Sequence, residues 1–197
     1  MTDLAPITNY LCEAIDTTAA NIECISPDIE QACHIITQTL LNDGKIIICG
    51  NGLSNAVASI FSSTLLNQQE FARPSLPAIN ISADPSCILS ISKSSSQHQI
   101  FANQISAIGS EGDTLVALST DGNCGNIIQA IQAAHEKDIN VITITGFQSG
   151  KTTAILQSDD IDIRIESNSV ARVLEIQLLI VNCLCYQLDA TLFGSMD

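Results

Sequence analysis

The sequence predicts an α/β fold in which helices cover both faces of a parallel sheet, and three observations lead to this prediction. Short apolar runs alternate with segments of helical periodicity along most of the chain. The first apolar run, 45–49, leads through Gly50 and Gly52 into small residues that begin a helical pattern. With 197 residues and a 46% hydrophobic composition, the chain is long enough to bury one full core.

The segment before the first strand is predicted to be helical. Apolar residues recur at steps of three and four over 8–42, and Ser26 followed by Pro27 is a typical restart signal, with Ser26 as the N-cap. Two helices are therefore expected there. Their apolar stripe lies outside the sheet core, so packing between subunits is a natural way to bury it. The expected divisions are one domain at 1–197, helices used in oligomer packing at 1–43, and an α/β core at 44–197.

Strands and helices then alternate to the end of the chain. The loops that follow the strands of a parallel sheet build its ligand site, which places the expected site in the loops at 50–54, 82–86 and 119–124. The predicted strands lie at 45–49, 77–81, 113–118, 140–145 and 161–165. The predicted helices lie at 55–69, 84–91, 97–108, 125–137 and 170–188. The segment 89–98 is expected to be an exposed polar loop beside the site.

Composition and charge exclude several functions. The formal net charge is -14, from 7 Lys and Arg against 21 Asp and Glu, so the surface is unsuited to neutralising nucleic-acid phosphates. The chain has neither a signal-peptide pattern nor the roughly 18 uninterrupted apolar residues of a membrane span, which predicts a soluble, cytoplasmic protein. Most of the 8 cysteines fall inside apolar runs, as buried reduced thiols do.

The glycine turn at 50–54 suits an anion. Such a turn points backbone N–H groups outward at a helix N-terminus, and Asn51 and Ser54 add side-chain donors, so a sugar phosphate is a suitable ligand. The alternative is purely structural: Ser54 and the Ser119–Thr120 pair would cap helices and satisfy turns.

Two loop motifs carry a family resemblance. Gly-Asn-Gly-Leu-Ser at 50–54 and Ser-Thr-Asp-Gly-Asn at 119–123, each between a strand and a helix, resemble the SIS (sugar isomerase) domain of the phosphoheptose isomerase branch. The resemblance covers nearly the whole chain and implies a flavodoxin-like three-layer sandwich that assembles into a homotetramer. It also implies a phosphosugar site, whose donors fall at Asn51, Ser54, Ser119, Thr120 and Asn123.

The resemblance allows a direct test of catalysis. Isomerases of this branch build a metal site and an acid/base pair from a His, a Glu, a Gln and a second His. These positions fall at Ile60, Thr64, Leu174 and Asn182 in this chain. Ile and Leu cannot take and return a proton, and the set lacks metal ligands. No catalytic residue, metal or cofactor is therefore expected. The phosphate loop also departs from the family at Asp121, whose carboxylate would oppose an anion, and at Cys124, where a Ser is usual.

Three further segments resemble the SIS proteins that associate with the replication initiator DnaA: residues 73–79, Gly112 with Asp113, and 181–193. In those proteins the Leu-Phe pair at the positions of Leu192 and Phe193 contacts the initiator. We therefore expect a non-enzymatic homotetrameric adaptor that binds DnaA and promotes its assembly at the chromosomal origin. The alternative is a phosphosugar sensor or an isomerase-like enzyme acting on sedoheptulose 7-phosphate.

Overall fold

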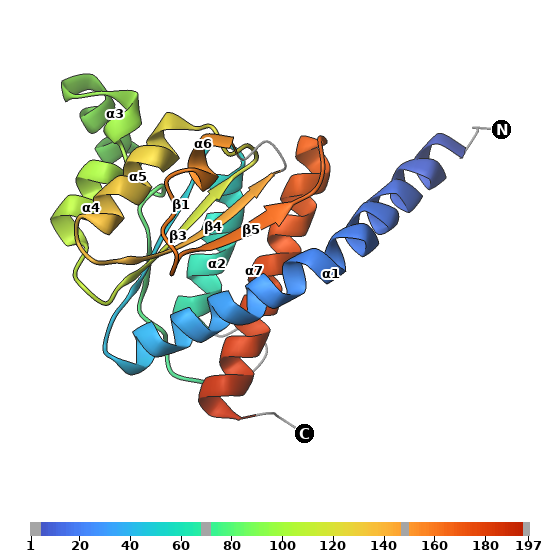
Figure 1. Ribbon diagram of the computed structural model, residues 1–197, viewed down its shortest axis with the longest axis horizontal. Coiled ribbons are helices and arrows are strands. Elements are labelled where there is room, and N and C mark those ends of the chain that lie inside the picture. The colour runs from blue at the N-terminus through green and yellow to red at the C-terminus, as the bar shows by residue number, and fades with distance from the viewer. Residues whose placement is uncertain (1–4, 68–71, 147–149, 195–197) are drawn as a thin grey trace.

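The computed structural model describes residues 5–67, 72–146 and 150–194, and its centre is a sheet of five parallel strands in the order β2-β1-β3-β4-β5 (Figure 1). The central strand β3 pairs with β1 on one side and with β4 on the other. This arrangement confirms the predicted α/β fold. The strands are β1 (Ile46–Gly50), β2 (Ala78–Asn80), β3 (Thr114–Ser119), β4 (Asn140–Gly146) and β5 (Ile161–Ile165).

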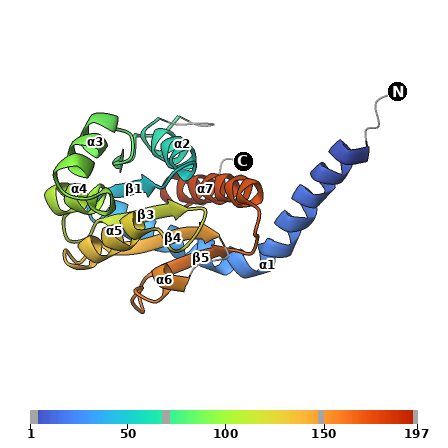
Figure 2. The ribbon, with the colours of Figure 1, turned by 90° about the horizontal axis from the view of Figure 1, so that it is seen from above.

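Helices cover both faces of this sheet. Alternate strand residues point to opposite faces, so Ile46 and Ile48 join one hydrophobic cluster while Ile47 and Cys49 join the other. Seen from above, α2 and α7 lie along one face and α5 lies along the other (Figure 2). The helices of the first face are α1 (Ala5–Leu41), α2 (Ser54–Leu66) and α7 (Val170–Phe193), and those of the second are α4 (Ala102–Ile108) and α5 (Gly125–His135).

The N-terminal segment is one helix, so the prediction of two helices was wrong. Ser26 is not an N-cap: its hydroxyl donates to the Ile22 carbonyl oxygen at 2.6 Å, as a serine inside a helix does. Pro27 lies within α1 and supplies no N–H to the helix. Proline costs about 3 kcal/mol in a helix interior. Burial of Ala32, Cys33 and Ile36 against the core offsets this cost beyond the proline.

The five strands agree with the prediction to within a few residues, whereas several helical segments differ from it. The segment expected to be an exposed loop at 89–98 is mostly helical, because the Asp84 carboxylate caps α3 (Pro85–Ser94) through the N–H groups of Ser86 and Cys87. The helix predicted at 97–108 divides into the 3₁₀ turn η1 (Gln97–Gln99) and α4. A short helix, α6 (Gly150–Thr153), was not predicted, and part of the helix predicted at 55–69 lies outside the described residues.

α7 is the one helix of the described residues that is long and apolar enough to cross a membrane. Its buried face includes Val173, Ile180 and Leu188, which pack in the core cluster between the sheet and the helices α1 and α2. A core helix of a soluble protein passes the same test of length and composition, so this feature is weak support for a membrane span.

A buried ion pair fastens the end of α7 to the connection between α2 and β2. The Arg73 guanidinium lies 2.6 Å from an Asp189 carboxylate oxygen, and both side chains are at most 10% exposed. Arg73 also donates to the carbonyl oxygens of Thr64 and Leu65 near the end of α2. The end of α7 therefore meets the end of α2 and the connection that follows it at one guanidinium.

We predict that Asp189→Ala lowers the free energy of unfolding by about 3–5 kcal/mol, because it leaves the buried Arg73 without its counter-charge. Chemical denaturation of the purified variant measures this loss. Asp159→Ala is the matched control, since Asp159 is exposed and forms one hydrogen bond, with the neighbouring Ser158. Equal stability of the two variants would contradict the prediction.

Candidate functional site

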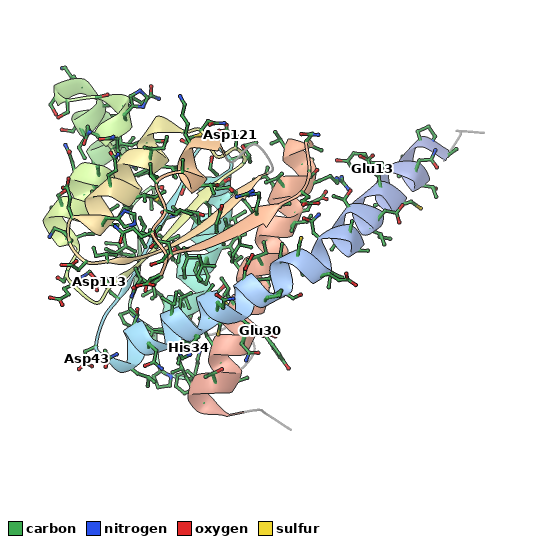
Figure 3. The ribbon with its side chains drawn as sticks, viewed as in Figure 1. Glu13, Glu30, His34, Asp43, Asp113 and Asp121 are labelled. Atoms are coloured by element: carbon green, nitrogen blue, oxygen red, sulfur yellow. The ribbon has the colours of Figure 1, made fainter. Side chains whose placement is uncertain are left out.

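The glycine turn after β1 meets the loop after β3 at the carboxyl edge of the sheet. Gly52 has a φ of 57°, and a Cβ at Gly50 would collide with the backbone of Ser54 and Asn55. Gly50 therefore has no room for a side chain, and the left-handed φ of Gly52 favours glycine. Figure 3 shows Asp121 at this edge and Asp113 at the opposite end of the same strand. The helices α2 and α5 both begin at this edge, so two helix N-termini lie on either side of it.

Asn51 joins the two loops directly. Its amide nitrogen donates to the Cys124 sulfur at 2.9 Å, and its amide oxygen accepts from the Asn126 side chain at 2.8 Å. Both polar atoms of the Asn51 side chain are therefore already hydrogen-bonded within the protein.

Ser54 is completely buried, and its hydroxyl donates to the Gln177 amide oxygen at 2.9 Å. The Gln177 amide nitrogen in turn donates to the carbonyl oxygens of Ser119 and Ile144, both at 2.9 Å. The sequence analysis missed Gln177. The sequence feature that could have identified Gln177 is that it is the one amide in the stretch 173–181, where every other buried residue is aliphatic.

The loop at 119–124 also satisfies most of its own polar groups. The buried Ser119 hydroxyl lies 3.3 Å from the Cys124 sulfur and accepts from the Asp121 N–H. The Asp121 carboxylate accepts from the Asn123 N–H at 2.8 Å, and the Asn123 side chain accepts from Lys151 N. Thr120 is half-buried, and its hydroxyl has no partner within the described residues.

The donors that remain for an anion are mainly backbone groups. Within the described residues, no hydrogen bond uses the N–H groups of Gly52, Leu53, Gly125 or Asn126. These groups lie at or just before the first residues of α2 and α5, where the helix dipole favours a negative charge. The structure thus brings together the five predicted donor residues, but most of their side chains are hydrogen-bonded to other residues of the protein.

The thiol of Cys124 and the ring of His98 lie beside the start of α5. Burial raises the pKa of the Cys124 thiol, and the Asp121 charge raises it further, while hydrogen bonds from Ser119 and Asn51 lower it. Cys124 is therefore a neutral thiol rather than an activated nucleophile. His98 is an exposed residue whose ring packs against Gly125, where a Cβ would collide with it.

The four positions that the resemblance assigns to isomerase catalysis hold no acid or base. Ile60 is 39% exposed, Thr64 is buried, Leu174 packs against the core and Asn182 is exposed. One hydroxyl and one amide do not fit the metal that the resemblance implies. No group of three or more His, Cys, Asp or Glu that could hold a metal ion occurs within the described residues.

Thr64 and Asn182 nevertheless line a groove of about 800 Å³ between α1, α2 and α7. Its other polar residues include Glu30, labelled in Figure 3 where α1 crosses α7, and Asp189 of the buried ion pair. Glu30 has no ion-pair partner in the described part of the chain. The groove therefore contains a carboxylate even though the four expected positions do not.

Leu192 and Phe193 end α7, beyond the predicted helix end at 188. Leu192 is partly buried against the core cluster, whereas Phe193 is 45% exposed. The first of these residues therefore stabilises the fold, and the second leaves much of its ring at the surface.

Comparison with known proteins places this geometry in a family. The SIS domain profile matches residues 9–146, and the chain belongs to the SIS domain family. The phosphoheptose isomerase of Chromohalobacter salexigens is 43% identical over 97% of this chain and 97% of its own length. A phosphoheptose isomerase structure from Francisella tularensis superposes with a TM-score of 0.91 at 37% identity, covering 96% of this chain and 99% of that chain. The structure of the Neisseria gonorrhoeae enzyme gives a TM-score of 0.89 at 32% identity, covering 94% of this chain and 98% of that chain.

These relatives correct two predictions. The expectation of a non-enzymatic adaptor for DnaA was wrong in its function, because the relatives at 42–43% identity over nearly the full length are named phosphoheptose isomerase. The expectation that the chain is not an enzyme was wrong for the same reason. It rested on four side chains, and the comparisons over the whole chain outweigh that argument. The contact predicted at Leu192 and Phe193 is not tested by these likenesses and stays a prediction.

Proposed function

We propose that this chain is a phosphoheptose isomerase-like enzyme that binds a phosphorylated seven-carbon sugar such as sedoheptulose 7-phosphate. The observation that carries the proposal is the likeness to phosphoheptose isomerases at 43% identity over 97% of the chain. The free backbone N–H groups at the starts of α2 and α5 support it, because they suit a phosphate at the carboxyl edge of the sheet. The bacterial relatives and the acidic charge agree with a cytoplasmic location.

Uncharged hydrogen-bond donors bind the phosphate in this proposal. The chain offers the N–H groups of Gly52, Leu53, Gly125 and Asn126 and the Thr120 hydroxyl, whereas Ser54 and Ser119 are engaged inside the protein. The Asp121 carboxylate would repel a phosphate that came close to it. The phosphate is therefore expected over the glycine turn, on the side of the loop away from Asp121.

Proton transfer between neighbouring carbons of the sugar needs a group that takes and returns a proton. We assign this role to Glu30, the carboxylate in the groove that has no ion-pair partner among the described residues. Ser54 and Thr64 are ten residues apart on α2, which is about 15 Å along a helix. A seven-carbon sugar phosphate is shorter than this separation. We therefore propose that the phosphate donors and the groove of one active site come from two copies of the chain.

Ligand binding and turnover together test this function. We expect sedoheptulose 7-phosphate, but not unphosphorylated sedoheptulose, to raise the thermal unfolding temperature. At 100 times its dissociation constant, a ligand of the native state adds about 2.7 kcal/mol to the free energy of unfolding. We also expect aldose–ketose conversion of the sugar phosphate by the purified protein, measured by NMR.

A matched pair of variants tests the role of Glu30 in the same assay. Glu30→Gln should remove turnover and keep binding, whereas Glu13→Gln, on the projecting part of the same helix, should retain both. Binding without turnover in the wild-type protein would contradict the enzymatic part of the proposal. Absence of binding would contradict all of it.

We further propose that the chain forms a homotetramer and that α1 contributes to its interface. The first half of α1 projects away from the rest of the molecule (Figure 2). One stripe of this half is apolar and exposed, with Ile7 at 63%, Leu11 at 58% and Ile15 at 68%. These residues recur every fourth position, so they lie on one face of the helix. A second helix of the same kind would cover this face.

Leu11→Glu should therefore lower the oligomer mass observed by light scattering, because it introduces a charge into the apolar stripe. Asn9→Glu is the control, since Asn9 is exposed and lies two residues from both Ile7 and Leu11, on another face of α1. A wild-type monomer, or equal masses for the two variants, would contradict this assignment of the interface.

A further inference from the structure

Gln177 is a fully buried amide in the core between α7, α2 and the sheet. Its neighbours on the buried face of α7 are Val173, Ile176, Ile180 and Val181, all aliphatic. A side-chain amide in such surroundings is stable only when its polar atoms are paired. Gln177 meets this requirement with three hydrogen bonds of 2.9 Å each.

The chemistry of its partners fixes the orientation of this amide. The carbonyl oxygens of Ser119 and Ile144 can only accept hydrogen bonds, so the Gln177 nitrogen must face them. The Gln177 oxygen then faces Ser54, and the Ser54 hydroxyl must donate to it. The hydrogen of this hydroxyl is therefore engaged within the protein and is not available to a ligand.

The three partners of Gln177 belong to the three elements that build the carboxyl edge of the sheet. Ser54 is the first residue of α2, Ser119 is the last residue of β3, and Ile144 lies near the end of β4, where this strand pairs with β3. The free N–H groups of the glycine turn directly precede Ser54, and the loop that leads into α5 directly follows Ser119. One buried side chain thus holds together the two loops that carry the anion donors.

We propose that Gln177 is the positioning residue of the phosphosugar site. It fixes the start of α2 against the ends of β3 and β4, so that the backbone N–H groups of both loops converge on one phosphate, and it directs the Ser54 hydroxyl away from the ligand. This inference rests on the proposed function and adds a residue that acts through others, without contact to the sugar.

Variants of Gln177 and Ser54 test the proposal through the dissociation constant of sedoheptulose 7-phosphate, measured by calorimetry. Gln177→Met keeps the size of the side chain and removes all three hydrogen bonds. We expect it to weaken binding about tenfold, the effect typical of breaking a buried hydrogen-bonded group. The double variant with Ser54→Ala should bind no more weakly than Gln177→Met alone, because the two residues act as a unit.

A control separates positioning from general stability. Leu188→Ala empties a fully buried site on the same helix, eleven residues from Gln177, and should lower the unfolding temperature without changing affinity. If Gln177→Met does not fold, Gln177→His, which keeps one donor and one acceptor, takes its place, with an expected affinity between those of wild type and the tenfold loss.

Three results would overturn the inference. The first is wild-type affinity in the folded Gln177 variant. The second is an affinity loss in Leu188→Ala as large as that in Gln177→Met. The third is full additivity of Ser54→Ala and Gln177→Met, which would make Ser54 a direct ligand donor. If the wild-type protein does not bind the sugar phosphate, the proposed function fails and this inference fails with it.

Discussion

Parallel pairing of all five strands is the constraint on which the rest of the structure depends. Because the strands run the same way, the turn after β1 and the loop after β3 reach the same edge, and the helices that follow begin there. Both faces of the sheet must be covered, which buries α7 and places Gln177 beneath that edge. The position of the candidate site thus follows from strand direction before any ligand is considered.

The edge combines features that favour an anion with features that oppose one. Two helix starts with free N–H groups favour a phosphate, whereas the Asp121 carboxylate opposes it. The thiol of Cys124 stays neutral because burial and Asp121 both raise its pKa. Phosphate binding at this edge therefore depends on backbone donors more than on side chains. Ile60 and Thr64, at two of the positions that the resemblance assigns to catalysis, cannot act as acid or base, and for this reason the proposed proton transfer is assigned to Glu30.

Much of the fold could be predicted from the sequence, because apolar runs and glycine turns are local signals. The strand at 45–49 and the turn at Gly50 and Gly52 are examples. The helix break predicted at Pro27 does not occur, because burial of the following helical turns outweighs the local cost of the proline. This burial is a tertiary effect that the local sequence does not show. Gln177 was missed because its partners lie 33 to 123 residues away in sequence. The donor residues were predicted, but the hydrogen bonds that engage them with other residues depend on packing that periodicity does not show.

We propose that a sugar phosphate binds where α2 and α5 begin. A crystal structure of the protein with sedoheptulose 7-phosphate tests it most directly. The account predicts phosphate oxygens within hydrogen-bond distance of the backbone N–H groups of Gly52 and Gly125, with the Ser54 hydroxyl still bonded to Gln177. A phosphate bound elsewhere, or held by the Ser54 hydroxyl, would contradict the account.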